Sequence, residues 1–223
     1  MYALITDGSI AKYLNGNKGI TIGDIQYPRS IFSLWTASEK AAIGIYEIIW
    51  DNSNKKDEAY YINTNQTYTY DADAGTVTAA YGDATAKAHA DVDEVWTQEE
   101  IDADRAPDGT SDGDAKNDSD GNQIITRGLK YNLIKIIKAQ VAGILQDTDW
   151  YILRKADANT DVPSAITTFR AAVRTKGAAM ETLITNASNT AAIETLYTYV
   201  NTADEGDPVV MVRPLGEFPI LGS

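Results

Sequence analysis

The sequence predicts an α+β protein in which a β-rich N-terminal unit is followed by a unit of antiparallel helices. Three observations lead to this prediction. Short runs of apolar and polar residues, separated by turn residues, occupy positions 1–82, as is typical of strands joined by hairpins. Apolar residues at spacings of three and four dominate positions 127–205, as is typical of packed helices. Between them, residues 83–122 carry 13 acidic and 3 basic side chains.

The first two strands are expected at residues 2–5 and 9–14. They flank Asp7 and Gly8, and both of these residues tolerate the positive φ angles that a tight hairpin turn requires. We therefore expect an antiparallel hairpin at the start of a β-rich domain that spans residues 1–82 and serves for docking or oligomerisation.

One short helix is expected in this domain, at residues 37–43. Thr36 and Glu39 have the spacing of a capping box, in which the hydroxyl and the carboxylate accept hydrogen bonds from free N–H groups at the start of a helix. Gly44 is expected to end the helix. Residues 45–50 are mostly apolar and are expected to form a buried strand.

Three more strands are expected at residues 59–63, 66–70 and 76–81. In the second of them, Tyr68 and Tyr70 alternate with threonines, which is typical of a strand with one buried face. A short loop joins the second and third strands, so these two are expected to form another hairpin.

Residues 83–126 are expected to be an acidic, flexible linker or loop. Aspartate, alanine, glycine and threonine dominate this segment, and few large apolar side chains are present to offset the entropy of ordering it. Thr97 and Glu100 repeat the capping-box spacing, so one short helix is expected near residues 98–105.

The helical domain is expected to span residues 127–205. Its first helix carries a continuous apolar stripe. Its second helix begins at Pro163, whose missing N–H costs nothing at a first helical position. Asn189 or Thr190 is expected to cap a third helix. The predicted arrangement is an antiparallel helical hairpin or a three-helix unit, followed by an extended tail at 206–223 that contains three prolines.

Composition and charge argue against several classes of protein. The net charge is −13, and no basic patch is present, so neither nucleic acid nor an anionic membrane surface is an expected partner. No segment is apolar over the length needed to span a bilayer. The first residues lack the features of a secretion signal. A soluble protein made in a cytoplasm is expected.

Residues suited to catalysis or metal binding are few. The chain has no cysteine, and its one histidine, His89, lacks the neighbours that a catalytic triad or a zinc site requires. The Asp- and Gly-rich run 108–121 does not fit an EF-hand, because Ser119 stands where a bidentate carboxylate is needed. Glu99 and Glu100 adjoin each other, whereas a glycosidase pair faces across a cleft. No catalytic residue, cofactor or metal site is therefore expected, and the protein is not expected to be an enzyme.

Aromatic residues leave two interpretations open. The chain has 13 tyrosines and 4 tryptophans, and many of the tyrosines lie in the β-rich domain. Tyrosine combines apolar area with a hydroxyl group. These residues therefore suit the packing of a small sheet, and they equally suit a contact surface for a partner or a glycan.

The segment after the first long helix predicts a corner, in which a polar loop leads to the second helix. Trp150 is expected to pack beneath the helix pair and close its end. Arg170 and Arg174 lie one turn apart and share a helix face. Asp147 or Asp149 is expected to pair with them. The alternative is that the two arginines face a partner subunit, because arginine is enriched at interfaces.

This corner resembles the C-terminal signature of tail-fibre and related tail proteins of bacteriophages. The matching residues are Thr148, Asp149, Trp150, Arg154, Val162, Pro163, Phe169, Arg170 and Arg174. The version in this chain is particularly similar to structural proteins of phages that infect marine bacteria, including cyanobacteria. Residues 2–8, 27–46 and 66–81 are also similar to such proteins.

The resemblance implies a non-enzymatic structural component of a phage tail, such as a tail fibre, a fibre-attachment protein or a baseplate-associated protein. It implies other tail proteins, further copies of the chain (often three) and a host surface receptor as partners, and a place in the virion after assembly in the host cytoplasm. Two alternatives stay open: a tail-fibre assembly chaperone absent from the mature virion, and a module that binds a host receptor or glycan. The interface candidates are Trp150, Arg154, Pro163, Phe169, Arg170 and Arg174.

Overall fold

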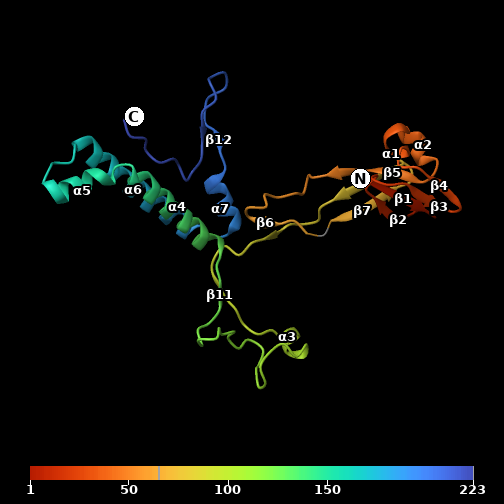
Figure 1. The fold of residues 1–223 in the computed structure, drawn as a ribbon, viewed down its shortest axis with the longest axis horizontal. Helices are drawn as coiled ribbons and strands as arrows, with labels where there is room; N and C mark the ends of the chain where they lie inside the picture. The colour runs from red at the N-terminus through yellow and green to blue at the C-terminus, as the bar shows by residue number, and fades with distance from the viewer. Residues whose placement is uncertain (65, 223) are drawn as a thin grey trace. The chain divides into compact units, whose positions relative to one another are not determined.

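The chain folds into two compact units, Met1–Ala86 and Lys87–Ser223, in a computed structural model that describes residues 1–64 and 66–222. Figure 1 shows most of the strands in the first unit and the long helices in the second. The predicted α+β class, with a β-rich N-terminal region and a helical C-terminal region, is confirmed.

The first unit is built on a five-stranded sheet with the strand order β2-β1-β5-β8-β7. Its strands are β1 (Tyr2–Thr6), β2 (Ser9–Leu14), β5 (Ile45–Asp51), β7 (Thr67–Asp71) and β8 (Thr76–Ala80). Neighbouring strands pair antiparallel, except that β5 and β8 run parallel. The predicted hairpins β1–β2 and β7–β8 are confirmed, whereas the sequence does not predict the parallel pair between them.

Strand β5 joins the two hairpins into one sheet. Its first residues pair with β1, where Tyr2 lies opposite Glu47, and its last residues pair with β8, where Val77 lies opposite Ile48. Each half of β5 therefore has a different partner strand. No turn between adjacent elements specifies such a pairing, which depends on contacts between distant parts of the sequence.

The burial of β5 corrects one prediction. Ile45 and Ile48 are buried, as expected, but Ile49 and Trp50 are 52% and 45% exposed. A run of apolar residues predicts that a strand forms. It does not show which side chains of that strand are covered by a neighbouring element. The expected buried strand is therefore buried only in part.

Shorter elements accompany the sheet. They are the hairpin of β3 (Ile20–Ile22) and β4 (Ile25–Tyr27), the helices α1 (Ile31–Leu34) and α2 (Ala37–Ala41), and the paired strands β6 (Tyr61–Ile62) and β9 (Thr85–Ala86). The predicted capping box of α2 is confirmed. Thr36 Oγ1 accepts a hydrogen bond from the N–H of Glu39 at 3.2 Å, and Glu39 Oε2 accepts one from the N–H of Thr36 at 2.8 Å.

Two hydrophobic clusters lie on opposite faces of the sheet. Successive residues of β1 contribute to them in alternation, because neighbouring side chains of a strand point to opposite faces. One cluster contains Leu14, Ile20, Ile31, Phe32 and Ile45, and the other contains Ala3, Ile48, Val77 and Ala79.

Tyrosine pairs border the second cluster. The rings of Tyr46 and Tyr70 lie 5.1 Å apart, and the Tyr70 hydroxyl donates a hydrogen bond to the Tyr46 hydroxyl at 3.2 Å. Tyr13 on the edge strand β2 contacts Tyr68 on the opposite edge strand β7, with 4.6 Å between ring centres. The sheet therefore curls until its edges meet. Of the two interpretations of the tyrosines, sheet packing applies to these four.

The acidic segment contains β10 (Val92–Asp93), α3 (Gln98–Asp102) and β11 (Ile125–Thr126), and β10 pairs with β11. The predicted capping box of α3 is confirmed, because Glu100 Oε2 accepts a hydrogen bond from the N–H of Thr97 at 3.1 Å. The other oxygen of Glu100 accepts a hydrogen bond from Lys116 Nζ at 2.7 Å. Within the segment expected to be a linker, the structure thus places a capped helix that is tied to a distant lysine.

Four helices follow, together with one short hairpin. They are α4 (Leu129–Gln146), α5 (Asp149–Ala158), α6 (Ser164–Asn186) and α7 (Thr190–Tyr197), and the hairpin consists of β12 (Val200–Asn201) and β13 (Met211–Val212). Helix α7 is capped by Asn189, whose side chain accepts a hydrogen bond from the N–H of Ala192 at 2.8 Å. Of the two predicted caps, Asn189 and Thr190, the structure therefore shows Asn189.

Helix α5 contradicts the prediction of a polar loop between the two long helices. Its local signals are an acid in the first turn, Asp149, and a base in the last turn, Lys155, both placed favourably for the helix dipole. Asn159 ends the helix in the left-handed conformation, with φ 48°. These signals are present in the sequence, but they lie between the mostly polar residues 147–149 and 157–161, which are typical of a loop.

The core of the second unit lies between α4 and α6. It contains Ile137, Met180, Ile184 and Leu215, all buried. The sequence alone predicts that Gly177 weakens α6 modestly. In the structure Gly177 is buried, and a Cβ atom added there would lie 2.5 Å from Val141 Cγ2 on α4. The glycine therefore allows the two helices to approach each other closely.

We expect Gly177→Ala to lower the free energy of unfolding of the helical unit by about 1–2 kcal/mol. Overpacking against Val141 outweighs the gain in helix propensity, which is at most about 1 kcal/mol. Gly143→Ala on α4 is the matched control, because nothing lies within 4 Å of its added Cβ. It should stabilise by about 0.5–1 kcal/mol. Urea unfolding followed by circular dichroism compares the two variants, and equal stabilisation by both would contradict the close approach.

We expect acid to destabilise the α3 region only at pH values below the ordinary pKa of a glutamate. The Lys116 ammonium, followed by the Thr97 backbone N–H, lowers the pKa of Glu100 from 4.5 to about 2. The ionised form therefore stabilises the fold. This stabilisation is complete above about pH 4.5 and is lost as the pH falls towards 2. An NMR titration of the side-chain carboxyl groups should give a Glu100 midpoint near 2, and a higher midpoint in Lys116→Met. The exposed-lysine variant Lys135→Met should leave the midpoint unchanged, and a wild-type midpoint near 4.5 would refute the assignment.

Candidate functional site

Arg170 on α6 holds the corner between α4 and α5. Its Nη1 donates hydrogen bonds to the carbonyl oxygen of Leu145 at 2.8 Å and to Thr148 Oγ1 at 2.7 Å, and its Nη2 forms an ion pair with Asp149 Oδ1 at 2.9 Å. The planar guanidinium presents several donors in a fixed geometry, which suits such a convergent set of acceptors. The Arg170 side chain is only 11% exposed. The predicted pairing of Arg170 with Asp149 is confirmed.

The end of α4 gains a second donor at the same point. Thr148 is buried, and its hydroxyl donates a hydrogen bond to the carbonyl oxygen of Leu145 at 2.9 Å. The last carbonyl groups of a helix lack partners within the helix, and its C-terminus carries partial negative charge. Arg170 and Thr148 therefore stabilise α4 where the chain turns into α5.

Trp150 does not close the end of the helix pair, and this expectation is wrong. It is 49% exposed on α5, and its ring stacks on that of Tyr151 with 3.9 Å between ring centres. The Arg154 guanidinium lies 4.7 Å from the centre of the Trp150 ring and 5.5 Å from that of Tyr151. In the described part of the chain, the buried Nε of Arg154 has no hydrogen-bond partner. The sequence missed Tyr151 as a member of this cluster.

Pro163 stands at the end of the loop that joins α5 to α6. It occupies the N-cap position of α6, with φ −51° and ψ 138°, so the helix begins at Ser164, one residue later than predicted. An ion pair between Lys155 Nζ and Asp161 Oδ1, at 2.6 Å, links the end of α5 to the loop, and the Lys155 ammonium lowers the pKa of Asp161. The loop is thus anchored at both ends.

Phe169 lines a hollow of about 360 Å³ between helix residues and the C-terminal tail. The other lining residues are Ile144, Asp147, Thr148, Phe218, Pro219, Ile220 and Leu221. The tail is held in place by Leu215, which is fully buried, and its carbonyl oxygen accepts a hydrogen bond from Lys176 Nζ at 2.8 Å. Phe169 therefore belongs to packing around the corner.

Arg174 does not join the corner. It lies one turn after Arg170 but is exposed, and no ion pair is found for it among residues 1–64 and 66–222. Arg170 is therefore an internal clamp. For Arg174, contact with a partner subunit stays a prediction.

Large apolar side chains around the corner are exposed to solvent. On α5, Ile152 and Leu153 are 43% and 68% exposed, beside the half-exposed Trp150. On the tail, Ile220 and Leu221 are 75% and 46% exposed. The sequence did not predict Ile152 and Leu153 as surface residues. No helix was expected at this point, and without one the two side chains could not be assigned to a helix face. We refer to Trp150, Tyr151, Ile152, Leu153 and Arg154 as the α5 surface.

Among residues 1–64 and 66–222, no group of three or more acidic or histidine side chains could hold a metal ion, and no helix is long and apolar enough to cross a membrane. Comparisons of the chain with protein-family models, with curated proteins and with solved structures find no match.

We expect Arg170→Met to lower the free energy of unfolding of the helical unit by about 2–4 kcal/mol. The substitution leaves the Leu145 carbonyl and Thr148 with fewer partners and removes an ion pair in which Arg170 is 11% and Asp149 52% exposed. Arg174→Met is the matched control on the same helix and should change stability by less than about 0.5 kcal/mol. Urea unfolding followed by circular dichroism measures both. Equal effects of the two substitutions would exclude the clamp.

Proposed function

We propose that this chain is a non-enzymatic structural component of a bacteriophage tail, such as a tail fibre, a fibre-attachment protein or a baseplate-associated protein. It holds neighbouring tail proteins together as a homo-oligomer within the virion and presents a surface to the host. The observation that carries this proposal is the exposed α5 surface, which lies within the segment that resembles the signature of phage tail proteins.

The composition of the α5 surface supports a docking role. Trp, Tyr and Arg are the residues most enriched among those that dominate binding energy at protein interfaces. Here Trp150, Tyr151 and Arg154 contact one another on a single helix, with Leu153 68% exposed beside them. Such a cluster exposes apolar area to water, and burial against a partner protein would recover the associated free energy.

The rigidity of the corner supports the same role. The Arg170 contacts hold the start of α5, and the Lys155–Asp161 ion pair joins its end to the following loop. Side chains that are fixed before association lose less conformational entropy when they bind. The α5 surface is therefore arranged before a partner arrives.

This proposal predicts that the protein is found in purified particles of the phage that encodes it. Mass spectrometry of such particles should detect its peptides at a constant ratio to known tail proteins. Leu153→Asp should strongly reduce incorporation, because it places a charge in the buried part of an interface. Val209→Asp is the matched control, since Val209 is 70% exposed in the same unit and lies outside the α5 surface, and it should be incorporated at the wild-type level.

Other outcomes would contradict the proposal in different ways. Absence of the chain from intact particles, together with its presence in infected cells, would favour the tail-fibre assembly chaperone. Equal incorporation of Leu153→Asp and Val209→Asp would retain a virion protein but remove the α5 surface as its docking site. Turnover of a host polysaccharide by the purified protein would refute the non-enzymatic role.

A further inference from the structure

Arg154 on the α5 surface is a cation without an acceptor. Its guanidinium lies over the rings of Trp150 and Tyr151. Among residues 1–64 and 66–222 it forms no ion pair and donates no hydrogen bond, and its Nε atom is buried as well as unpartnered. Contact with aromatic rings recovers only part of the free energy that a cation loses when it leaves water. The charge of Arg154 is therefore only partly compensated.

Other arginines that contact rings are paired with a carboxylate. Arg127 lies over a tyrosine ring and forms an ion pair with Asp91, and Arg213 lies over two tyrosine rings and forms one with Glu217. A guanidinium can stack on a ring by its face while the N–H groups in its plane bind a carboxylate. Arg154 has the rings without the carboxylate.

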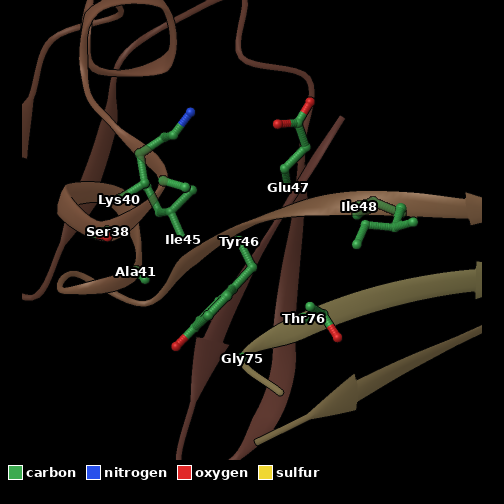
Figure 2. Close-up of a pocket in the computed structure, with 11 residues that line it drawn as sticks. Ser38, Lys40, Ala41, Ile45, Tyr46, Glu47, Ile48, Gly75 and Thr76 are labelled. Atoms are coloured by element: carbon green, nitrogen blue, oxygen red, sulfur yellow. The ribbon is translucent and has the colours of Figure 1, made fainter.

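Lysines that contact aromatic rings also have carboxylates beside them. Lys55 and Lys116 each form an ion pair with a glutamate. Lys40 lies over the Tyr2 ring and, together with Glu47, lines a hollow of about 550 Å³ beside α2. Figure 2 shows the Lys40 and Glu47 side chains extending towards the same side of β5. Each of these lysines thus has an acidic side chain in its own surroundings.

Acidic residues near Arg154 do not supply the missing partner. The carboxylates of Asp149 and Asp161 already pair with other cations. Asp157 lies three residues after Arg154 on α5, and within the described part of the chain the two form no ion pair. A carboxylate from outside the chain is therefore the group that this arrangement lacks.

The free donors of Arg154 determine how such a carboxylate can approach. Nε is buried, whereas Nη1 and Nη2 are neither buried nor bound to another described residue. The two Nη atoms form the end of the planar guanidinium, where one carboxylate can accept hydrogen bonds from both. Because the rings already hold the guanidinium in place, its binding costs less side-chain entropy.

Apolar surface lies directly beside these donors. Leu153 and Arg154 are three and four residues after Trp150, so both neighbour its ring on the helix surface. Trp150 is 49% exposed and Leu153 is 68% exposed. A ligand that carries a carboxylate next to an aliphatic group would match both parts of this surface.

We infer that the partner of the α5 surface presents a glutamate or aspartate flanked by aliphatic side chains. The carboxylate accepts hydrogen bonds from Nη1 and Nη2 of Arg154, and the aliphatic groups cover Leu153 and the exposed part of Trp150. A charge pair at an interface also suppresses partners of the wrong charge. This inference rests on the proposed function, because it names the chemistry of the partner at the same surface.

Two capped peptides, Leu-Glu-Leu and Leu-Gln-Leu, test this inference on the purified full chain. They differ in the charge of the central side chain and are otherwise nearly the same in shape. Binding is followed by the NMR signals of the Trp150 indole and the Leu153 methyl groups. The glutamate peptide should move these signals in a saturable manner. The glutamine peptide should bind roughly tenfold more weakly, because the charge-assisted hydrogen bonds to Arg154 are lost.

Arg154→Met removes the guanidinium and keeps an unbranched apolar side chain. It should weaken binding of the glutamate peptide roughly tenfold and leave binding of the glutamine peptide nearly unchanged, because only the first peptide has a charge to pair. Arg105→Met is the matched control, since Arg105 is 57% exposed in the same unit and lies outside the α5 surface. It should keep the wild-type preference for glutamate.

The wild-type protein alone decides the question if Arg154→Met fails to fold, which circular dichroism would show. Equal binding of the two peptides, or binding of neither, overturns the inference. With a folded variant, an equal loss for both peptides also overturns it, because Arg154 would then act only by packing on Trp150. Failure of the proposed function is read separately, as absence of the chain from particles. A chain that is present in particles but shows no preference for glutamate would keep that function and lose only this inference.

Discussion

The contacts of one guanidinium determine how the helical unit turns from its first long helix into α5. Arg170 reaches across from α6 and contacts the last turn of α4, the buried Thr148 and the first acid of α5. A helix C-terminus leaves carbonyl groups without partners and carries partial negative charge, so a cation at this point satisfies both requirements. Arg170 belongs to α6, so the same contacts fix the turn from α4 into α5 and hold α6 against that turn. Asp149 adds a counter-charge that also lies in the first turn of α5, where an acid is favourable.

The first unit depends on a different constraint, which is the shared use of β5 by two hairpins. One half of β5 pairs with β1 and the other with β8, so the strand holds together two hairpins that each form locally. The alternation of β1 side chains between the two hydrophobic clusters then fixes the register, since a slip by one residue would exchange the faces. The contact of Tyr13 with Tyr68 joins the outer strands.

Local features of the fold could be predicted from the sequence, and non-local ones could not. The turn at Asp7-Gly8 and the caps at Thr36 and Thr97 depend on residues that are close in the chain, and the structure confirms them. The parallel pairing of β5 with β8 depends on residues far apart, and no local pattern specifies it. Of the six candidate interface residues, Arg170 was expected to pair with Asp147 or Asp149 because of their opposite charges, and the structure shows the pair with Asp149. The exposure of Trp150 could not be predicted, because it follows from α5, a helix that mostly polar residues flank on both sides and that was expected to be a loop.

Because apolar residues of α5 are exposed, the contacts that stabilise this helix must be sought elsewhere than on a buried face. A helix of ten residues is marginal in water by itself, and burial of an apolar face is the usual source of its stability. Helix α5 instead exposes Leu153 and half of Trp150, and no residue of this helix is buried. Its ends are held by Arg170 at the start and by Asn159 and the Lys155–Asp161 ion pair at the finish. These contacts leave Trp150, Ile152 and Leu153 exposed along the helix, as the proposed docking role requires.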